Sequence, residues 1–417
     1  MRKKFSFIYL FSFFVLLRSL LGGVEAFSQQ INVDNVKRHI KYLSSDKLKG
    51  RATGSQEEQT CANYISKNFA KLKLEMKGNL GSFYYSYKFK KPKNPHDTIG
   101  GETVQGLDVA GYLDNGADYT IIIGGHYDHL GLGKDHNSLD ANPEGKIHNG
   151  ADDNASGTAG VLELARYFSQ NNRKEKFNFL FICFSGEELG LFGSKKFCEN
   201  PTIDFSKVNY MINMDMIGRL ADSTNKLIVY GVGTSADWVP VLDKTNPGFS
   251  IRKDSSGIGP SDQTSFYLKN IPVLHFFTGQ HSDYHKPSDD WQKINFKGEK
   301  KVLDYIVNVI EETEKLPKMK FLETKNSEEG KSSFKVTMGV MPDYAFEGKG
   351  LRIDGVTDGK SASKAGILKG DIVIKMGNEV ISDINDYMKA LSKFSKGDTA
   401  DVVILRSGKE MQMKVTF

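Results

Sequence analysis

Histidine and carboxylate residues follow three apolar runs of this chain, at the point where each run ends. The runs and the residues that follow them are Tyr119–Ile123 before His126, Phe177–Phe184 before Glu187 and Glu188, and Val208–Met214 before Asp215. Two more candidates are Asp153, in a polar segment between the first two runs, and His285, far downstream. Imidazole and carboxylate groups are ligands that zinc and similar divalent ions take from proteins. The pattern therefore indicates a metal site.

These groups are numerous enough to hold two metal ions. Two ions a few ångströms apart need a bridging carboxylate, terminal ligands on each side and an acid or base nearby. Five residues can serve as ligands: His126, Asp153, Glu188, Asp215 and His285. Glu187 is left for proton transfer. Taken singly, these groups have ordinary explanations, since a Glu-Glu pair is usually a solvated turn and Asp-Asp-Asn before a helix is usually an N-cap. Their joint occurrence at successive strand ends favours the metal site.

The surrounding sequence alternates between strand-like and helical patterns. Short runs rich in β-branched and aromatic residues recur from about residue 107, and two further ones are Leu227–Tyr230 and Ile271–Phe277. Apolar residues at helical spacing mark 161–168 and 302–310, and earlier 33–43 and 55–72. This alternation predicts an α/β layer fold with a largely buried sheet. In such sheets ligands bind beyond the carboxyl ends of the strands, which is where the candidate ligands fall.

Five segments, in this order, resemble those of the M28 zinc peptidases of the bacterial leucyl-aminopeptidase type. They are GGHYDHLG, NGADDNASGTAG, CFSGEELGLFGSK, NMDMIGR and DYHKPSDDW. The stretch LSSDKLKGRATGSQEEQTCANYI is similar to that family's N-terminal helix region, so the resemblance covers roughly residues 33–316. It implies a mixed, mostly parallel sheet sandwiched by helices, the zinc-exopeptidase type of fold. It also implies two zinc ions per chain.

The resemblance implies how the five candidate ligands divide between the two ions. His126 and Asp215 would hold one zinc ion. Glu188 and His285 would hold the other, and Asp153 would bridge both.

Three further residues receive roles from the resemblance. Glu187 would be the general base and then the general acid, while the zinc ions would activate a water and polarise the scissile carbonyl. Asp128 matches the carboxylate that accepts the second N–H of the ligand imidazole two residues before it. Tyr284 matches a residue that hydrogen-bonds the oxyanion in some members.

The remaining histidines and the three cysteines match no ligand position. Three histidines are expected at the surface or in a lid: His129, His136 and His148. His275 lies inside an apolar run and is expected to be a satisfied core histidine. Three cysteines are too few for a disulfide scaffold. Cys61 and Cys183 are expected to be buried and inert, and whether Cys183 pairs with Cys198 is left open.

The first 26 residues are typical of a secretory signal peptide. They have a basic start, an apolar stretch over Phe5–Leu21 and a small-x-small pattern ending at Ala26. An uncleaved anchor is the alternative, but Arg18 interrupts the stretch and leaves 13 residues, which is short for a membrane span. We therefore expect an exported protein, periplasmic or secreted, with no stable membrane span after cleavage. The net charge of +5 falls to +2 without this segment, because it carries four basic residues and one acidic residue. No nucleic-acid-binding surface is indicated.

The sequence after residue 316 predicts a linker and a second domain. Residues 317–333 are charged, polar and weakly periodic, whereas residues 334–417 are strand-rich and numerous enough for a small domain. The segment GKGLRIDGVTDGKSASKAGILKGDIVIKMGN resembles a bacterial PDZ domain. Such domains bind extended peptides by strand addition and capture a terminal carboxylate with backbone N–H groups. The corresponding loop would be Met338, Gly339, Val340 and Met341, and the alternative is a spacer that binds nothing.

The leading expectation is an exported metallo-aminopeptidase that removes N-terminal residues from peptide substrates. A carboxypeptidase of the same fold is the second hypothesis, and it would need a cationic pocket for the substrate carboxylate. A glutaminyl-cyclase-like enzyme with one zinc ion is the third, although the five-ligand set argues against it. A non-catalytic, PDZ-tethered binding protein is the fourth, and the presence of Glu187 beside all five ligands argues against that.

Overall fold

A computed structural model describes residues 30–79, 81–91, 101–135, 137–324, 336–342, 346, 348–356 and 359–417. The expected signal segment, His136 and the end of the expected linker lie outside the described residues. In the part of the chain that is described, no helix combines the length and the apolar character that a membrane span needs.

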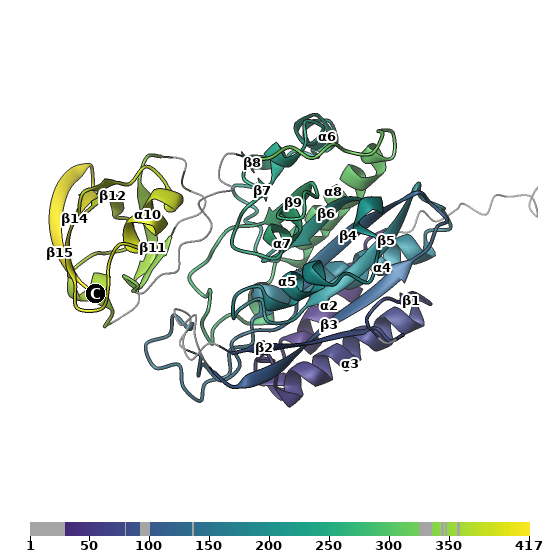
Figure 1. The fold of residues 1–417 in the computed structure, drawn as a ribbon, viewed down its shortest axis with the longest axis horizontal. Coiled ribbons are helices and arrows are strands. Elements are labelled where there is room, and N and C mark those ends of the chain that lie inside the picture. The colour runs from purple at the N-terminus through teal and green to yellow at the C-terminus, as the bar shows by residue number, and fades with distance from the viewer. Residues whose placement is uncertain are drawn as a thin grey trace, which may run out of the picture. The chain divides into compact units, whose positions relative to one another are not determined.

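The first domain is built on a nine-stranded sheet (Figure 1). Its strands are β1 (Glu75–Met76), β2 (Tyr84–Lys90), β3 (Thr103–Leu113), β4 (Tyr119–His126), β5 (Phe177–Phe184), β6 (Val208–Met214), β7 (Lys226–Tyr230), β8 (Ser250–Asp254) and β9 (Val273–Phe277). The strand order is β1-β3-β5-β4-β6-β9-β7-β8, and β2 pairs with β3. The central strands β5, β4, β6 and β9 run parallel, whereas β3 and β7 pair antiparallel with them. Every residue of β5 and β6 is buried, which explains their continuous apolar sequences.

Helices cover both faces of this sheet, as Figure 1 shows. They are α2 (Val33–Leu43), α3 (Gln56–Lys71), α4 (Gly157–Gln170), α5 (Phe192–Glu199), α6 (Trp238–Thr245), α7 (Gln263–Tyr267) and α8 (Phe296–Thr313). Alternate residues of a strand point to opposite faces, so Ile121 and Ile123 of β4 join the core under α2, α3, α4 and α8. Ile122 joins a second core that contains Phe197 of α5 and Phe266 of α7. The predicted α/β sandwich is confirmed.

The C-terminal domain has its own sheet and core. Its elements are β10 (Val340–Pro342), β11 (Leu351–Val356), α9 (Ser361–Lys364), β12 (Ile372–Met376), β13 (Glu379–Val380), α10 (Ile384–Leu391), β14 (Thr399–Arg406) and β15 (Lys409–Thr416). The strand order is β10-β11-β12-β14-β15, all antiparallel, with β13 on β12. Arg406 donates two hydrogen bonds to the carboxylate of Asp371, at 2.8 and 2.7 Å, and these connect β14 to the start of β12. The predicted β-rich second domain is therefore present.

The segment after α8 stays attached to the first domain up to residue 324. Met319 is buried in the core of the first domain, and its N–H donates to the side chain of Asn209 at 2.8 Å. The N–H of Thr324 donates to the hydroxyl of Tyr267 at 2.9 Å. Residues 318–324, expected to be linker, are thus packed against the domain that precedes them.

Candidate metal centre

The sheet topology brings the three strand ends together. β5, β4 and β6 are parallel neighbours, so their carboxyl ends lie at one edge of the sheet. β4 ends at His126, which is paired in register with Phe184, the last residue of β5. Glu187 follows β5, and Asp215 follows β6 directly. The order and register of the strands therefore bring His126, Glu187 and Asp215 close together, although they are far apart in the sequence.

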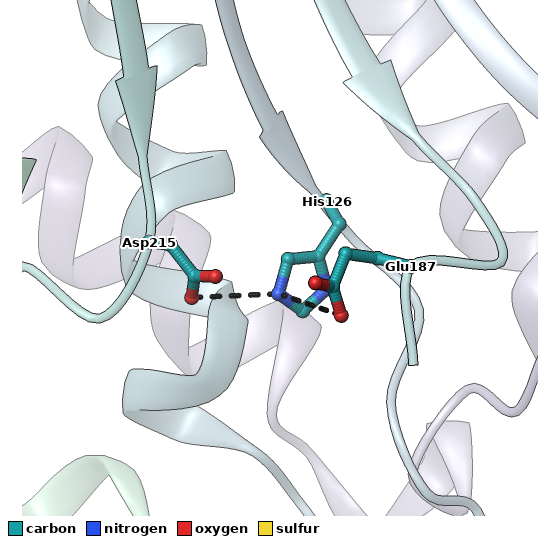
Figure 2. Close-up of side chains that lie close together, drawn as sticks. All are labelled: His126, Glu187 and Asp215. Atoms are coloured by element: carbon teal, nitrogen blue, oxygen red, sulfur yellow. Dashed lines mark ion pairs between the residues drawn. The ribbon is translucent and has the colours of Figure 1, made fainter. Parts of the chain in front are cut away.

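His126 lies at the centre of the first group of side chains (Figure 2). Its Nε2 atom is 3.4 Å from Oδ1 of Asp153 and 3.4 Å from Oδ1 of Asp215. Glu187 is slightly more distant, with Oε2 at 3.9 Å from the same nitrogen. These side chains are almost completely buried.

His285 is the nitrogen donor of the second group. Its Nε2 atom is 3.1 Å from Oδ2 of Asp153 and 3.2 Å from Oε2 of Glu188. Asp153 therefore presents one oxygen to His126 and the other to His285. This is the arrangement that a carboxylate shared by two ions requires.

The donor atoms fit divalent metal ions in both spacing and bonding state. Zinc binds nitrogen and oxygen at roughly 2.0–2.2 Å, which separates two ligands of a tetrahedral site by about 3.4 Å. The N–O separations given above lie close to this value. Nε2 of His126, Oδ2 of Asp153 and Oδ1 of Asp215 are buried, and none of the three has a hydrogen-bond partner among the described residues. Buried polar atoms are normally paired. A bound cation would supply the partner that these three buried atoms lack.

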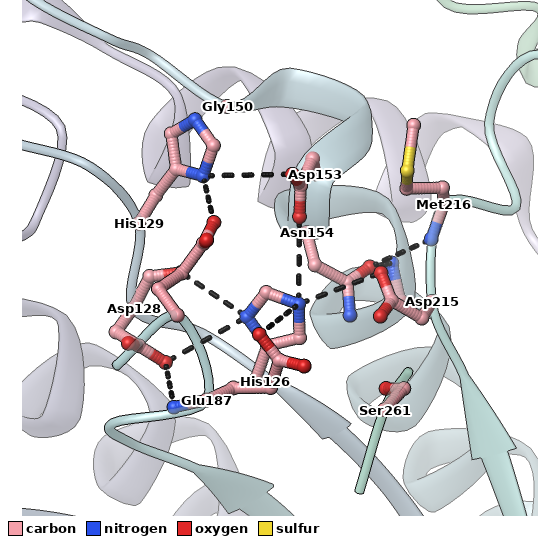
Figure 3. Close-up of polar contacts among 12 residues, drawn as sticks. His126, Asp128, His129, Gly150, Asp153, Asn154, Glu187, Asp215, Met216 and Ser261 are labelled. Atoms are coloured by element: carbon pink, nitrogen blue, oxygen red, sulfur yellow. Dashed lines mark hydrogen bonds and ion pairs between the residues drawn. The ribbon is translucent and has the colours of Figure 1, made fainter. Parts of the chain in front are cut away.

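The loop that carries Asp153 is fixed by the residues on either side of it. The N–H groups of Asp152 and Asp153 both donate to Oδ2 of Asp289, at 2.9 and 3.1 Å. Asn154 donates to the carbonyl of Met214 at 3.0 Å and accepts from the N–H of Met216 at 3.2 Å (Figure 3). The loop is thereby tied to the end of β6, beside Asp215.

A buried arginine ties the same loop to the end of β4. Arg51 is 0% exposed, and its guanidinium donates to five backbone carbonyls. The carbonyls belong to Tyr127 (2.5 Å), Asn149 (2.5 Å), Gly150 (2.7 Å), Leu43 (3.1 Å) and Asp153 (3.4 Å). Arg51 thus joins the segment after β4 to the segment that leads to Asp153. Arg51 lies in the stretch that resembles the family's N-terminal helix region, and no spacing or periodicity in that stretch indicates its role.

Asp128 connects His126 to Glu187. Its Oδ1 atom lies 3.6 Å from Nδ1 of His126 and accepts the N–H of Glu187 at 3.2 Å (Figure 3). Its Oδ2 atom accepts the hydroxyl of Thr53 at 2.7 Å. Nδ1 of His126 lies closer to the backbone carbonyl of Asp128, at 3.2 Å, than to this carboxylate, so support of the ring by the carboxylate stays a prediction. For His285, the corresponding contact is between Nδ1 and the carbonyl of Asn137, at 2.8 Å.

The two adjacent glutamates titrate in opposite directions. Burial raises the pKa of Glu187 well above its ordinary value, the charge of His126 opposes this, and the charge of Asp215 adds to it. Burial would also raise the pKa of Glu188, but the charge of His285 and the hydrogen bond from His129 outweigh it and lower that pKa to about 2. Environments that push the pKa values of two neighbouring carboxyls apart are the pattern of an acid/base next to a ligand.

A cavity opens beside these residues. It is lined by Asp153, Glu187, Asp215, Met216, Tyr230, Pro260, His275, Phe277, Gln280, Tyr284 and His285. None of the described residues that line it is a lysine or an arginine. The ring of Tyr284 stacks on that of His285, with 3.9 Å between centroids. The cavity is therefore acidic near the candidate ligands and aromatic further away.

Two of the histidines expected at the surface are buried, so that expectation was wrong for them. His129 is 2% exposed, and its Nδ1 atom lies 2.7 Å from Oε1 of Glu188. His148 is 0% exposed and contacts the hydroxyl of Ser138 at 2.7 Å. Both lie in a long segment without regular structure, and nothing in its sequence pattern marks them as buried. His275 is buried as expected, with Nδ1 3.1 Å from Asn213, but it also lines the cavity.

The three cysteines are free and buried, so Cys183 and Cys198 do not pair. Burial raises the pKa of Cys61 to about 12, and it raises those of Cys183 and Cys198 as well. The thiols are therefore protonated and inert at neutral pH.

Of the four residues expected to bind a peptide carboxylate, Met338 and Gly339 precede β10, whereas Val340 and Met341 are its first two residues. β10 pairs with β11 and lies at the end of the strand order. Gly339 has a left-handed backbone (φ +72°), and its N–H donates to the hydroxyl of Thr337 at 3.0 Å. Met338 is buried in the core of the domain. An end strand can accept a further strand on its other side.

Each of the two domains of the chain matches a known protein family. Residues 108–310 match peptidase family M28, and residues 324–417 match the PDZ domain family. Aminopeptidase YwaD of Bacillus subtilis is 29% identical over 184 residues, which make up 40% of this chain and 39% of that protein. Leupeptin-inactivating enzyme 1 of Streptomyces exfoliatus is 34% identical over 152 residues, 34% of this chain and 32% of that protein. The chain thus spans about a third to two fifths of the length of these curated relatives.

A solved structure shares the fold. A glutaminyl cyclase from Bacteroides thetaiotaomicron superimposes with a TM-score of 0.55 and 18% sequence identity, covering 68% of this chain and 98% of that one. A likeness at this identity concerns the fold, and enzymes of different activity share it.

Proposed function

Because the chain belongs to peptidase family M28 and carries a PDZ domain after its peptidase domain, we propose that it is an exported zinc aminopeptidase with two metal ions. The observation that carries this proposal is the position of Asp153, with Oδ1 3.4 Å from His126 and Oδ2 3.1 Å from His285. His126 and Asp215 would hold one ion. Glu188 and His285 would hold the other.

The residues around the candidate ligands would carry the proton transfers of peptide hydrolysis. When bound, two zinc ions would supply a water of lowered pKa and polarise the scissile carbonyl. Glu187, whose pKa is raised by burial, would accept the proton of that water and pass it to the leaving amine. Tyr284, on the cavity wall, would donate a hydrogen bond to the oxyanion.

The charge of the cavity favours the amino end of a peptide as the end that is trimmed. A carboxypeptidase needs a cation for the substrate carboxylate, and the described residues that line the cavity include no lysine or arginine. Asp153 and Asp215 would be bound to the metal ions, which leaves Glu187, of the described residues that line the cavity, as the carboxylate that would attract an ammonium group. The part of the cavity that is lined by aromatic residues would bind the side chain of the residue that is removed.

Mass spectrometry of peptide digests tests this function. Zinc-loaded protein without its first 26 residues is incubated with one peptide in three forms: unmodified, N-acetylated and C-terminally amidated. We expect stepwise loss of residues from the amino end of the unmodified and the amidated forms, and none from the acetylated form. Shortening from the carboxyl end would contradict the proposal. Loss of ammonia from a peptide that begins with glutamine, without any shortening, would indicate a cyclase instead.

Export and peptide capture are separate parts of the proposal. Residues 1–26 would be removed during export, and N-terminal sequencing of protein from the cell exterior or periplasm would then start near residue 27. The free side of β10 and the loop over Met338–Met341 would bind the C-terminal end of a peptide by strand addition.

A further inference from the structure

His129 is a buried polar residue to which neither the resemblance nor the proposed mechanism gives a role. It lies three residues after His126, yet its side chain points to the other half of the centre. Nδ1 of His129 is 2.7 Å from Oε1 of Glu188. The ring of His129 lies at the upper left of Figure 3. The distance from the same nitrogen to Oδ2 of Asp153 is 3.9 Å, which is too long for a hydrogen bond.

The two oxygens of Glu188 therefore have different partners. Oε1 is held by His129, whereas Oε2 lies 3.2 Å from Nε2 of His285. The oxygen that faces His285 is the one beside the bridging position of Asp153. The contact to His129 thus fixes the rotation of the Glu188 carboxylate.

The hydrogen-bonding state of His129 identifies it as a donor to Glu188. An ionised carboxylate only accepts hydrogen bonds, so Nδ1 of His129 must carry the proton in this contact. Nε2 is then an unprotonated acceptor, and it is buried without a hydrogen-bond partner among the described residues. If Nδ1 instead bound a metal ion, Nε2 would carry the proton and would be an unpaired buried donor. Orphaned buried donors are rarer than under-satisfied acceptors, so the donor role is favoured.

The ring of His129 is held in place by the backbone around it. A Cβ atom added to Gly150 would lie 2.4 Å from Cδ2 of His129, so the ring packs directly on the glycine backbone. Gly150 has φ +53°, a conformation that glycine adopts without strain. The N–H of His129 donates to the carbonyl of Arg51 at 3.3 Å. The ring therefore has little freedom to turn away from Glu188.

We propose that His129 is a positioning residue for the second metal position. Its Nδ1–H holds Oε1 of Glu188 and leaves Oε2 as the oxygen that faces the metal. This inference rests on the proposed metal centre, and it adds a residue that acts through Glu188 without touching the ion. Loss of such a partner typically weakens metal binding by about 10–100-fold.

A matched pair of variants tests this role by metal affinity. His129→Leu removes the donor, whereas His129→Asn keeps an N–H close to the position of Nδ1. Zinc affinity of the full chain is measured by competition with a chromophoric chelator, with the melting temperature of the metal-free protein as a control for folding. We expect His129→Leu to weaken one of two zinc equivalents by about 10–100-fold and His129→Asn to stay within a few-fold of wild type. Unchanged affinity in His129→Leu, or equal losses in both variants, would overturn the inference.

X-ray absorption at the zinc edge of the wild-type protein supplies a test that needs no variant. If His126 and His285 are the nitrogen ligands, the spectrum fits two imidazoles for two ions. Three imidazoles would make His129 a ligand and would overturn the positioning role. The wild-type zinc count distinguishes this failure from that of the proposed function, because a chain that binds no zinc contradicts the function itself. Two ions with unaltered binding in His129→Leu contradict only the inference.

Discussion

Arg51→Lys keeps the charge at a buried position but changes the number and directions of its donors. The guanidinium of Arg51 carries five N–H donors in a plane, and the structure directs them at five backbone carbonyls. A lysine ammonium has three donors on a single nitrogen at the end of a flexible four-carbon stem. It cannot reach carbonyls on both sides of the guanidinium. At least two of the five carbonyls would lose their donor.

The expected loss of stability follows from these carbonyls. A buried polar group that loses its partner costs about 1–3 kcal/mol. Two such groups give about 2–6 kcal/mol, which is a large share of the roughly 5–15 kcal/mol that stabilises a typical protein. Three of the carbonyls belong to the segment from Asn149 to Asp153. We therefore also expect zinc affinity to fall, by at least about tenfold for 1.4 kcal/mol of loop distortion.

Urea unfolding of the metal-free protein measures the first effect, and chelator competition measures the second. Arg38→Lys is the matched control, because Arg38 is exposed on α2. Surface changes of this kind stay within about 0.5 kcal/mol. If Arg51→Lys also stays within about 0.5 kcal/mol of wild type and keeps its zinc affinity, Arg51 does not hold the two segments together.

Three further predictions concern the glutamates and the domain boundary. Glu187→Gln should keep both metal ions and lose at least about 10²-fold in kcat, whereas Glu188→Gln should also weaken zinc binding, and the reverse pattern in metal analysis would exchange their roles. Burial raises the pKa of Glu58 from 4.5 to about 8, so this group's contribution to stability is lost as pH rises from about 4.5 through 8. Urea titrations at several pH values should show Glu58→Gln gaining stability relative to wild type across that range, and a constant difference would contradict the protonated state of Glu58. A protein that ends after Thr324 should fold and keep most of its kcat/KM on a dipeptide-sized substrate. The wild type alone should prefer a longer peptide with a free carboxyl end over the amide of that peptide. If the shortened protein is folded and zinc-loaded but inactive, the second domain helps to form the active site.

The strands and most of the candidate centre could be predicted because they depend on local sequence patterns. Continuous apolar runs mark β5 and β6, which are buried throughout. The parallel order of neighbouring strands then places the residues after them at one edge. His126, Glu187 and Asp215 were found by this reasoning, and the structure places Glu187 and Asp215 at 3.9 and 3.4 Å from Nε2 of His126.

The residues that sequence analysis missed are fixed by contacts between distant segments. Arg51 reaches carbonyls about a hundred residues away, and His129 reaches Glu188 across 59 residues. Neither contact leaves a periodicity or a spacing in the sequence. The packing of residues 318–324, expected to be linker, against the first domain has the same cause, since Thr324 is held by Tyr267, 57 residues before it.

The number and position of bound zinc ions test the central claim most directly. The mature protein is dialysed, loaded with zinc and analysed for metal, and crystals of it are measured on both sides of the zinc absorption edge. The account predicts two ions per chain, one on each side of Asp153, with His126 and Asp215 at the first and Glu188 and His285 at the second. A single ion per chain at saturating zinc would contradict the bridged centre and favour chemistry of the glutaminyl-cyclase kind.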